Sequence, residues 1–367
     1  MRILHAINSL ETGGAQHLLG TLLPALREQR SDMSVGVAVE RLTGSVIERR
    51  LERAGVPLYE FGGITELQRL LRLRRLSRQF DIVHAHLFPT LYRVASACNG
   101  MPLVFTEHST SNRRRLHPIP FRHLDRIAYA RYSAVVAISQ AVGDSLAAWG
   151  GCRIAKRIKV IPNGVVLPDS EGESHDTAPA GPEGKPMLLM LSRFVESKNH
   201  ELLLRGVAEM KRRDIRVVLA GEGAARERMI SLARDLGIAD ICEFPGMVEN
   251  PSQLIEEATV GVQLSHWEGF GLSAVEMMSR GLAVLASDIP GLSEVVGRGD
   301  DSGGMLVGGD DSGEVARQLE LLLTDEGLRR RSGENGRRRA RMFDIRKTAG
   351  EYAALYGMLV NGEQASH

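Results

Sequence analysis

The chain has 367 residues, of which 43% are hydrophobic and 25% charged, a composition typical of a globular protein long enough for two domains. Its three cysteines, Cys98, Cys152 and Cys242, are odd in number and far apart, which excludes an evident disulfide framework or zinc motif and fits a reducing cytoplasm. The first residues are too few and too polar for a signal peptide, and no apolar run approaches the roughly 18 residues of a spanning helix. We therefore expect a cytoplasmic protein.

Charge is unevenly distributed along the chain. Residues 1–165 contain 23 Lys and Arg against 12 Asp and Glu, whereas the remainder contains 23 against 33. A basic N-terminal half favours contact with an anionic partner, such as a membrane surface, a phosphorylated lipid or a nucleic acid. The alternative is that two oppositely charged domains attract each other.

Short runs rich in Val, Ile and Leu alternate with helical patterns, which predicts βαβ units and mostly parallel sheets. The expected strands of the first half are RILHAIN (2–8), SVGVAVE (34–40), DIVHAH (81–86), PLVFTE (102–107), AVVAIS (134–139) and IKVIPN (158–163). Those of the second half are PMLLMLS (186–192), IRVVLAGEG (215–223), ICEFPG (241–246), TVGVQLS (259–265), LAVLASD (282–288) and GGMLVGG (303–309). Each half of the chain is thus expected to form its own α/β domain.

A polar segment rich in Gly, Pro, Ser and acidic residues divides these halves and is typical of a linker. The expected divisions are an N-terminal domain (1–166), a linker (167–186), a C-terminal domain (187–342) and a terminal helix (343–367) that docks back on the N-terminal domain. Two doubly wound domains would face each other across a cleft, and ligands of open α/β sheets bind at the carboxyl ends of the strands. Functional residues are therefore expected in the loops that follow strands.

The first such loop contains Gly13 and Gly14, directly before a predicted helix. Glycines allow unusual φ angles and close approach of the backbone to a ligand, and amides that open a helix point at an anion. The sequence matches neither G-x-G-x-x-G nor a Walker A motif, which weakens the NAD and ATP interpretations. The loop is a phosphate-binding candidate, and a tight strand-to-helix turn is the alternative.

Three histidines, His84, His86 and His108, stand at the carboxyl ends of predicted strands. A single histidine in such a place is often structural, but three that face one cleft favour a function. The His-x-His pair could ligate a metal, yet no third ligand with suitable spacing is evident, so we expect no metal site.

Arg193 and Lys198 lie five residues apart in the loop that precedes a predicted helix, where two cations and helix amides could converge on a diphosphate. Further on, Glu268 precedes a Gly-Phe-Gly turn, and a carboxylate there is a natural partner for vicinal hydroxyls. Ser273 and Glu276 match a capping box, which is the structural alternative for Glu276. Amides for phosphate and carboxylates for diols together describe a sugar-nucleotide site.

These motifs resemble those of the retaining nucleotide-sugar glycosyltransferases of family 4 (glycosyltransferase group 1). The resemblance covers nearly the whole chain, and its motifs occur in order: GGAQ (13–16), TEHS (106–109), VIPNGV (160–165), LSRFVESKN (191–199), LAGEG (219–223), FPGMV (244–248), the E-x7-E signature EGFGLSAVE (268–276) and SRGLAVLASDIPGLSEVV (279–296). It implies the α/β GT-B fold, in which two Rossmann-like doubly wound domains face an interdomain cleft. Many relatives have Pro at the position of Ala283 and Gly at the position of Pro290, and Pro290 lies near the donor site that the resemblance implies.

The resemblance also implies residue roles. Arg193 and Lys198 would hold the donor diphosphate and stabilise charge on the leaving group, His108 would lie near the reacting carbon, and Glu268 would bind hydroxyls of the transferred sugar. Glu276 would bind the ribose, Met247 or Val248 would lie against the base, and the amides of 270–272 would hold phosphates and sugar. The donor-binding residues are Gly13, Gly14, Gly221, Met247, Val248, Phe270, Gly271, Leu272 and Glu276.

The activity implied is retaining transfer of a sugar from a UDP- or GDP-sugar to a saccharide or lipid-linked saccharide, in the synthesis of cell-surface polysaccharide, lipopolysaccharide or glycolipid. The nucleotide-sugar is a co-substrate, and no cofactor or metal is expected because Asp-x-Asp is absent. Front-face attack is implied, with Glu268 as a nucleophile the less favoured alternative. A GT-B sugar-nucleotide epimerase and a catalytically silent sugar-nucleotide-binding subunit remain the competing interpretations, and Arg193, Lys198 and the E-x7-E stretch favour transfer.

Two basic segments, Ser111–Arg126 and Leu67–Phe80, carry most of the excess of basic over acidic residues in the N-terminal half. Both could contact anionic headgroups or a lipid-diphosphate acceptor at the inner face of the membrane. An ordinary amphipathic helix with a solvated face is the alternative for Leu67–Phe80. Nucleic acid is not an expected partner, because no aromatic residues interleave with these arginines and no recognition motif is present.

Overall fold

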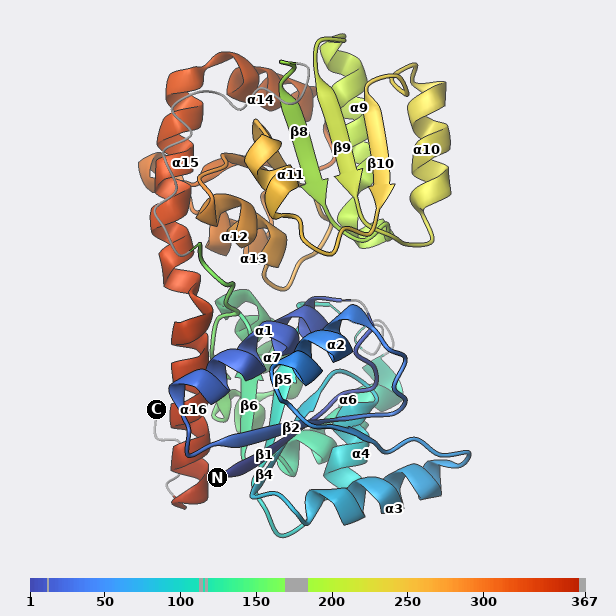
Figure 1. Cartoon of the computed structure of the whole chain (residues 1–367), viewed down its shortest axis with the longest axis vertical. Helices are drawn as coiled ribbons and strands as arrows, with labels where there is room; N and C mark the ends of the chain where they lie inside the picture. The colour runs from blue at the N-terminus through green and yellow to red at the C-terminus, as the bar shows by residue number, and fades with distance from the viewer. Residues whose placement is uncertain (12, 112–114, 116–117, 169–183, 363–367) are drawn as a thin grey trace. The chain divides into compact units, whose positions relative to one another are not determined.

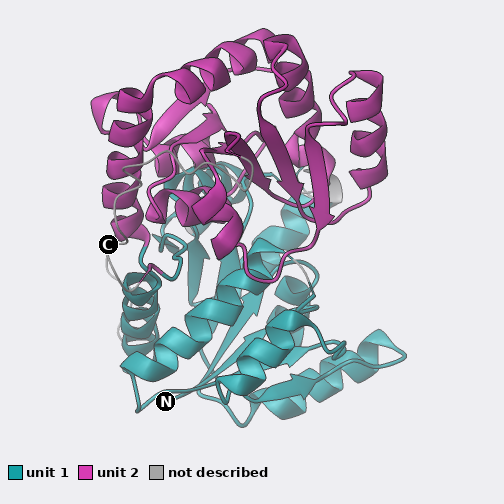
Figure 2. Cartoon of the chain, turned by 45° about the horizontal axis from the view of Figure 1, so that its top comes forward, with its two compact units in different colours: residues 1–166, 344–367 teal, residues 167–343 magenta. Residues whose placement is uncertain are grey.

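A computed structural model describes residues 1–11, 13–111, 115, 118–168 and 184–362. The chain forms two compact units, unit 1 from residues 1–166 and 344–367, and unit 2 from residues 167–343 (Figure 2). Most of the linker predicted at 167–186 lies outside the described residues.

Unit 1 is built on a sheet whose described strands run in the order β3-β2-β1-β4-β5-β6-β7, with every neighbouring pair parallel (Figure 1). These strands are β1 (Arg2–Ala6), β2 (Ser34–Val39), β3 (Leu58–Glu60), β4 (Ile82–His86), β5 (Leu103–Glu107), β6 (Ala134–Ala137) and β7 (Ile158–Val160). Six of them match predicted strands. The edge strand β3 was not predicted, because its three partly exposed residues form no apolar run.

The helices of unit 1 pack on this sheet. They are α1 (Gly14–Gln29), α2 (Val46–Arg53), α3 (Glu66–Ser77), α4 (Thr90–Ala97), α6 (Pro118–Ala130), α7 (Gln140–Gly150), α8 (Cys152–Ala155) and α16 (Ile345–Val360). The last of these, α16, runs beside α1 and buries Ile345, Ala349 and Tyr352 in the same hydrophobic core as the first strands (Figure 1). The final helix of the chain is thus part of the N-terminal unit.

Unit 2 is built on a second parallel sheet, with the described strands in the order β10-β9-β8-β11-β12-β13. These strands are β8 (Met187–Leu191), β9 (Arg216–Ala220), β10 (Cys242–Gly246), β11 (Val260–Gln263), β12 (Val284–Ser287) and β13 (Gly304–Val307). All six were predicted. The central strands β8, β11 and β12 are buried throughout and almost continuously apolar, as strands covered on both faces require, whereas the edge strands β10 and β13 are partly exposed.

The helical segments of unit 2 are η1 (Glu196–Lys198), α9 (His200–Met210), α10 (Arg226–Asp235), α11 (Ser252–Glu257), α12 (Leu272–Ser279), α13 (Pro290–Val296), η2 (Gly299–Asp301), α14 (Ser312–Thr324), α15 (Glu326–Ala340) and η3 (Arg341–Phe343). Asp311 caps α14, where its side chain accepts from the amides of Gly313 and Glu314. Asp325 caps α15 in the same way through the amide of Leu328.

The strand order reverses once in each sheet. In unit 1 the reversal lies between β1 and β4, and in unit 2 between β8 and β11. Loops that leave the carboxyl ends of strands on either side of such a reversal diverge and leave a crevice for ligands. These two places therefore define where the functional residues are sought. Among the described helices, none is both long and apolar enough to cross a lipid bilayer.

Candidate functional site

The reversal in unit 2 brings one predicted cation and a predicted carboxylate together, and the second predicted cation lies in the same loop as the first. Arg193 and Lys198 lie in the loop after β8, and Glu268 lies in the loop after the neighbouring strand β11. Lys198 Nζ donates to Glu268 Oε2, and the side chains of this pair are only 19% and 17% exposed. Arg193 is exposed at the same sheet edge. Lys198 and Glu268 thus meet at the strand ends, and Arg193 belongs to the same loop as Lys198.

A buried histidine anchors the loop that carries the two cations. His200 opens α9, stacks on Phe194 with ring centroids 4.2 Å apart, and lies 2.9 Å from Ser192 Oγ through Nε2. Burial, followed by the charge of Lys198, lowers the pKa of His200 to about 4, so the ring is neutral at pH 7. The loop between Ser192 and His200 is therefore held at both ends.

The loop after β9 packs tightly against this one and requires glycine. Gly221 has a φ of +151°, and a Cβ atom placed there would lie 2.0 Å from the carbonyl oxygen of Ser192. Gly223 is similar, with a Cβ position 2.3 Å from the carbonyl oxygen of Phe194. The amide of Phe194 donates to the carbonyl of Glu222 at 2.9 Å. Gly221, predicted as a donor-binding residue, thus lets two loops of the site touch.

The E-x7-E stretch turns directly into a helix. Gly271, with φ of +101°, is the N-cap of α12, and no side chain caps that helix. Ser273 is therefore not an N-cap, and the capping-box interpretation of Glu276 is wrong. The turn is also packed from outside, because a Cβ atom on Gly291 would lie 2.4 Å from the carbonyl oxygen of Glu268. Pro290, the residue that departs from many relatives, is the first residue of α13.

In the turn before α12 the side chain of Phe270 is buried, so a ligand would contact the backbone of the turn. Phe270 is 1% exposed and packs edge-on against Phe343, with ring centroids 5.2 Å apart at 90°. Leu272 begins α12, so its amide belongs to the first helical turn, whose N–H groups lack helical partners. Gly271 and Leu272 are thus placed as donors to an anion.

Met247 and Val248 follow β10, the edge strand of the same sheet. Met247 is 54% exposed, so its apolar side chain is accessible at this edge. Because all strands are parallel, these residues leave the sheet at the same edge as Arg193 and Glu268. An apolar surface at that edge suits a planar base.

In unit 1 the glycine pair lies at the start of α1. Gly13 is the N-cap, with φ of +151°, and a Cβ atom there would lie 2.4 Å from Gln16 Oε1. Gly14 is the first residue of the helix, and no side chain caps it. The first amides of α1 thus open beside β1, at the reversal of the sheet.

The predicted histidines are joined by one that the sequence analysis missed. His5 of β1 lies 3.0 Å from His86, and His86 lies 3.1 Å from His108, measured between ring nitrogens. His84 makes contacts of 2.7 Å with both Tyr356 Oη and Thr106 Oγ1. Potential ligand atoms of His5, His84 and His86 lie within 4.8 Å of one another. His5 was missed because its place beside His86 depends on β1 pairing with β4.

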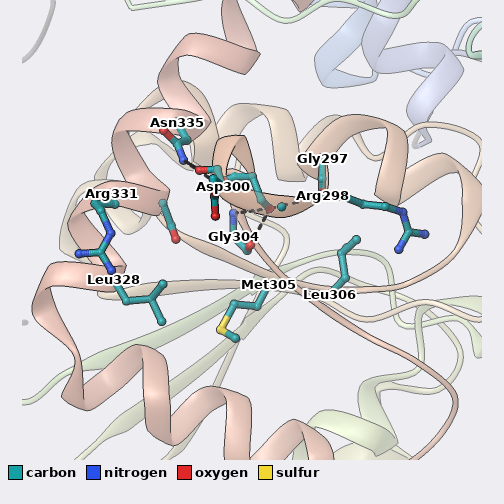
Figure 3. Close-up of a pocket in the computed structure, with 12 residues that line it drawn as sticks. Gly297, Arg298, Asp300, Gly304, Met305, Leu306, Leu328, Arg331 and Asn335 are labelled. Atoms are coloured by element: carbon teal, nitrogen blue, oxygen red, sulfur yellow. Dashed lines mark hydrogen bonds between the residues drawn. The ribbon is translucent and has the colours of Figure 1, made fainter.

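A separate hollow in unit 2 contains none of the predicted site residues. Figure 3 shows its lining between the segment 297–306 and α15, with Arg331 and Asn335 contributed by the helix. Asn335 Nδ2 donates to the carbonyl oxygens of Asp300 and Ser302, at 2.6 and 3.2 Å. These bonds tie the strand-connecting segment to α15 and indicate a structural role.

Two family models match the chain. Residues 12–167 match Glycosyltransferase Family 4, and residues 173–339 match Glycosyl transferases group 1. The chain belongs to the family 4 glycosyltransferases. It is a transferase of GT-B type, and each of its two units corresponds to one matched model.

Curated relatives agree with this assignment. A GalNAc-α-(1→4)-GalNAc-α-(1→3)-diNAcBac-PP-undecaprenol α-1,4-N-acetyl-D-galactosaminyltransferase of Campylobacter jejuni is 26% identical, covering 98% of this chain and 99% of the relative. A D-inositol 3-phosphate glycosyltransferase of Actinosynnema mirum is 28% identical, covering 76% and 72%. The chain is thus similar along its whole length to a glycosyltransferase.

Solved structures show the same fold. The Anabaena protein HepE, crystallised with UDP and glucose, superposes with a TM-score of 0.84 at 21% identity, covering 98% of this chain and 100% of HepE. A sucrose-phosphate synthase from Thermosynechococcus elongatus superposes with a TM-score of 0.82 at 19% identity, covering 99% and 100%. The GT-B fold predicted from the sequence is confirmed.

Proposed function

We propose that this glycosyltransferase moves a sugar from a UDP-sugar to a lipid-linked saccharide, with retention of configuration and without a metal ion. The observation that carries the proposal is the ion pair of Lys198 and Glu268 at the strand reversal of unit 2, with Arg193 in the same loop as Lys198. HepE was crystallised with UDP and with UDP-glucose, which favours UDP over GDP. The Campylobacter relative is named for an undecaprenyl-diphosphate-linked saccharide, which supports an acceptor of that class.

In this proposal the cations act on the leaving group. Arg193 and Lys198 hold the diphosphate and neutralise the charge that grows as the bond between the sugar and UDP breaks. The amides at Gly271 and Leu272 bind the same phosphates. The acceptor oxygen bonds to the anomeric carbon on the face that UDP leaves, and the acceptor proton passes to a phosphate oxygen of UDP. The protein contributes positioning and electrostatics.

The two glutamates of the E-x7-E stretch bind the two sugars of the donor in this proposal. Glu268 accepts hydrogen bonds from hydroxyls of the transferred sugar while its contact with Lys198 holds it beside the diphosphate. Glu276 accepts from the ribose, and Met247 or Val248 covers the base. His108 of unit 1 takes part in the transfer in this proposal.

Nucleotide release against a panel of UDP-, GDP- and ADP-sugars tests this proposal, with and without a chelator. We expect slow, chelator-resistant UDP release from one UDP-sugar, accelerated by an undecaprenyl-diphosphate saccharide. The anomeric configuration of the isolated product gives the stereochemistry by NMR. Release of GDP from a GDP-sugar, with no release of UDP, would overturn the choice of donor. Loss of rate with chelator would overturn the metal-independent mechanism, and an inverted product would overturn retention. A product that keeps its nucleotide would instead indicate an epimerase.

We also propose that α3 contacts an anionic membrane, where such an acceptor resides. Leu67 and Leu71 are 65% and 57% exposed, and Arg74 and Arg78 follow them at helical spacing on the same exposed face. Leu73 is buried in the unit 1 core, so α3 has a second, inward face. An exposed face that combines leucines and arginines favours a lipid interface over a fully solvated helix face.

Vesicle sedimentation tests the membrane proposal. We expect binding to phosphatidylglycerol vesicles at low salt and little binding to phosphatidylcholine. The double change Leu67→Ser and Leu71→Ser should weaken it, whereas Leu321→Ser, at an exposed leucine of unit 2, should not. Equal binding by all three proteins would argue against α3 as the contact.

A further inference from the structure

Three histidines of unit 1 meet edge to edge beneath the strand reversal. His5 comes from β1, His86 from the end of β4 and His108 from the residue after β5, and these three strands are neighbours. His5 Nδ1 lies 3.0 Å from His86 Nε2, and His86 Nδ1 lies 3.1 Å from His108 Nε2. The three rings form a continuous hydrogen-bonded chain.

The ring geometry agrees with hydrogen bonding through the ring edges. The centroids of His5 and His86 are 5.3 Å apart with planes only 15° apart, so the nitrogens face each other nearly in plane. His84 stacks on the face of His86, with centroids 4.2 Å apart. Tyr356 and Thr106 each contact one nitrogen of His84 at 2.7 Å and fix that ring. The chain is thus held on a fixed aromatic support.

Each ring of the chain is neutral near pH 7. Burial lowers the pKa of His5 and of His108 to about 3, and burial with neighbouring imidazoles lowers the pKa of His86 well below its usual range. A neutral imidazole has one N–H donor and one bare acceptor nitrogen. The three tautomers are therefore coupled, and only two orientations of the chain make both hydrogen bonds.

The two orientations differ at the ends. His5 Nε2 and His108 Nδ1 are both buried and have no hydrogen-bond partner among the described residues. One orientation leaves an N–H on His5 Nε2 and a bare acceptor on His108 Nδ1, and the other reverses this. His108 Nδ1 is buried as well, but His108 as a residue is partly exposed whereas His5 is fully buried, so a ligand or water molecule can more readily pair an N–H on His108 than one on His5. The orientation with a bare His5 Nε2 is thus favoured.

We propose that the chain from His5 through His86 fixes His108 in the Nδ1–H tautomer, so that His108 presents a neutral N–H donor. His5 donates through Nδ1 to His86, His86 donates through Nδ1 to His108, and the remaining N–H of His108 has no described partner. His5 and His86 are positioning residues. This inference rests on the proposed function for its consequence, which is that His108 acts in the transfer as a hydrogen-bond donor and not as a base.

A metal bound by His5, His84 and His86 would give a different arrangement. An imidazole binds a metal in the plane of its ring, whereas His84 stacks over His86 with planes 28° apart. Both nitrogens of His84 already contact hydroxyl oxygens. The contacts thus favour the hydrogen-bonded chain over a three-histidine metal centre.

Ring-nitrogen NMR of the full chain labelled with 15N-histidine tests the inference without any activity. Spectra that correlate ring nitrogens with ring protons separate the two tautomers, and His5→Asn, His86→Asn and His108→Asn assign the signals. We expect the Nδ1–H tautomer on His5, His86 and His108. An Nε2–H tautomer on His108 would overturn the inference, as would one equivalent of tightly bound zinc.

A matched pair at His86 tests the role of the chain. In His86→Asn the side-chain amide nitrogen lies near the position of Nδ1 and can still donate to His108, whereas in His86→Gln it lies near Nε2 and cannot. We expect His86→Gln to lower kcat/KM about 10-fold or more and to give His108 a mixture of tautomers. His86→Asn should restore most of that loss.

Equal losses in the two folded variants would overturn the positioning role. The proposed function and the tautomer inference can fail separately. If no sugar donor is turned over, the proposed function fails, while the NMR spectra still test the tautomers. If the protein is an active transferase and neither His86 variant changes its rate, His86 has no positioning role.

Discussion

Lys198 and Glu268 are 70 residues apart in the chain and form an ion pair at the strand reversal of unit 2. Each is more than four-fifths buried at its side chain. Partly buried pairs restrict both partners, and loss of one leaves the other without its compensating charge. The pair therefore fixes the positions of Lys198, which we propose binds the diphosphate, and of Glu268, which we propose binds the transferred sugar.

Lys198→Met should lower kcat by about 100-fold or more, because it removes a cation from the leaving group. Glu268 also loses its partner, so the KM for the donor should rise. Initial rates of nucleotide release measure both. Lys211→Asn is the control, since Lys211 is exposed and its φ of +56° suits asparagine. Rates within threefold of wild type for Lys198→Met would remove Lys198 from the mechanism.

Glu276→Gln should weaken donor binding about 10-fold or more while leaving folding nearly unchanged, because charge-assisted hydrogen bonds to the ribose are lost. Gly271 is the N-cap of α12, so the helix does not need Glu276 as a cap. Calorimetric titration with UDP and a thermal melt separate the two effects. A fall in melting temperature with unchanged UDP affinity would assign Glu276 to the fold.

Gly221→Ala should destabilise unit 2 and disorganise the cation loop. Its Cβ atom would lie 2.0 Å from the backbone oxygen of Ser192, where no side-chain rotation gives relief. Gly237→Ala is the matched control, because it also has positive φ but open space around the Cβ position. We expect the control to lower the free energy of unfolding by about 1 kcal/mol and Gly221→Ala to lower it by clearly more. Urea unfolding curves of both variants provide the comparison.

Acidification should destabilise the protein before most carboxylates titrate. His5 and His108 have a folded-state pKa of about 3, below the usual 6.5 of a histidine. Below pH 6.5 the unfolded chain binds protons that the folded chain excludes, so the free energy of unfolding falls as pH decreases toward 3. Each such ring contributes a slope of about 1.4 kcal/mol per pH unit. Melting temperatures at pH 7 and pH 5 should differ by several degrees, and a flat profile would show that these rings stay solvated.

Much of the fold follows from local pattern. Strands such as Met187–Leu191 are continuous apolar runs, and the terminal helix expected within 343–367 is found as α16, which buries Ile345, Ala349 and Tyr352. β3 was not predicted, because a three-residue edge strand needs no apolar run. Ser273 and Glu276 match a capping box in spacing, yet the cap is Gly271, two residues earlier, and the helix begins at Leu272.

The sequence by itself determined that the chain has two α/β halves and which loops carry cations, carboxylates and glycines, because strand and helix periods and loop composition are local properties. Only the tertiary structure decided which of these residues meet. The order of β1, β4 and β5 brings His5 into line with His86 and His108, and the order of β8 and β11 pairs Lys198 with Glu268. Strand order is set by packing over the whole sheet, so contacts between residues distant in the chain are absent from any local pattern.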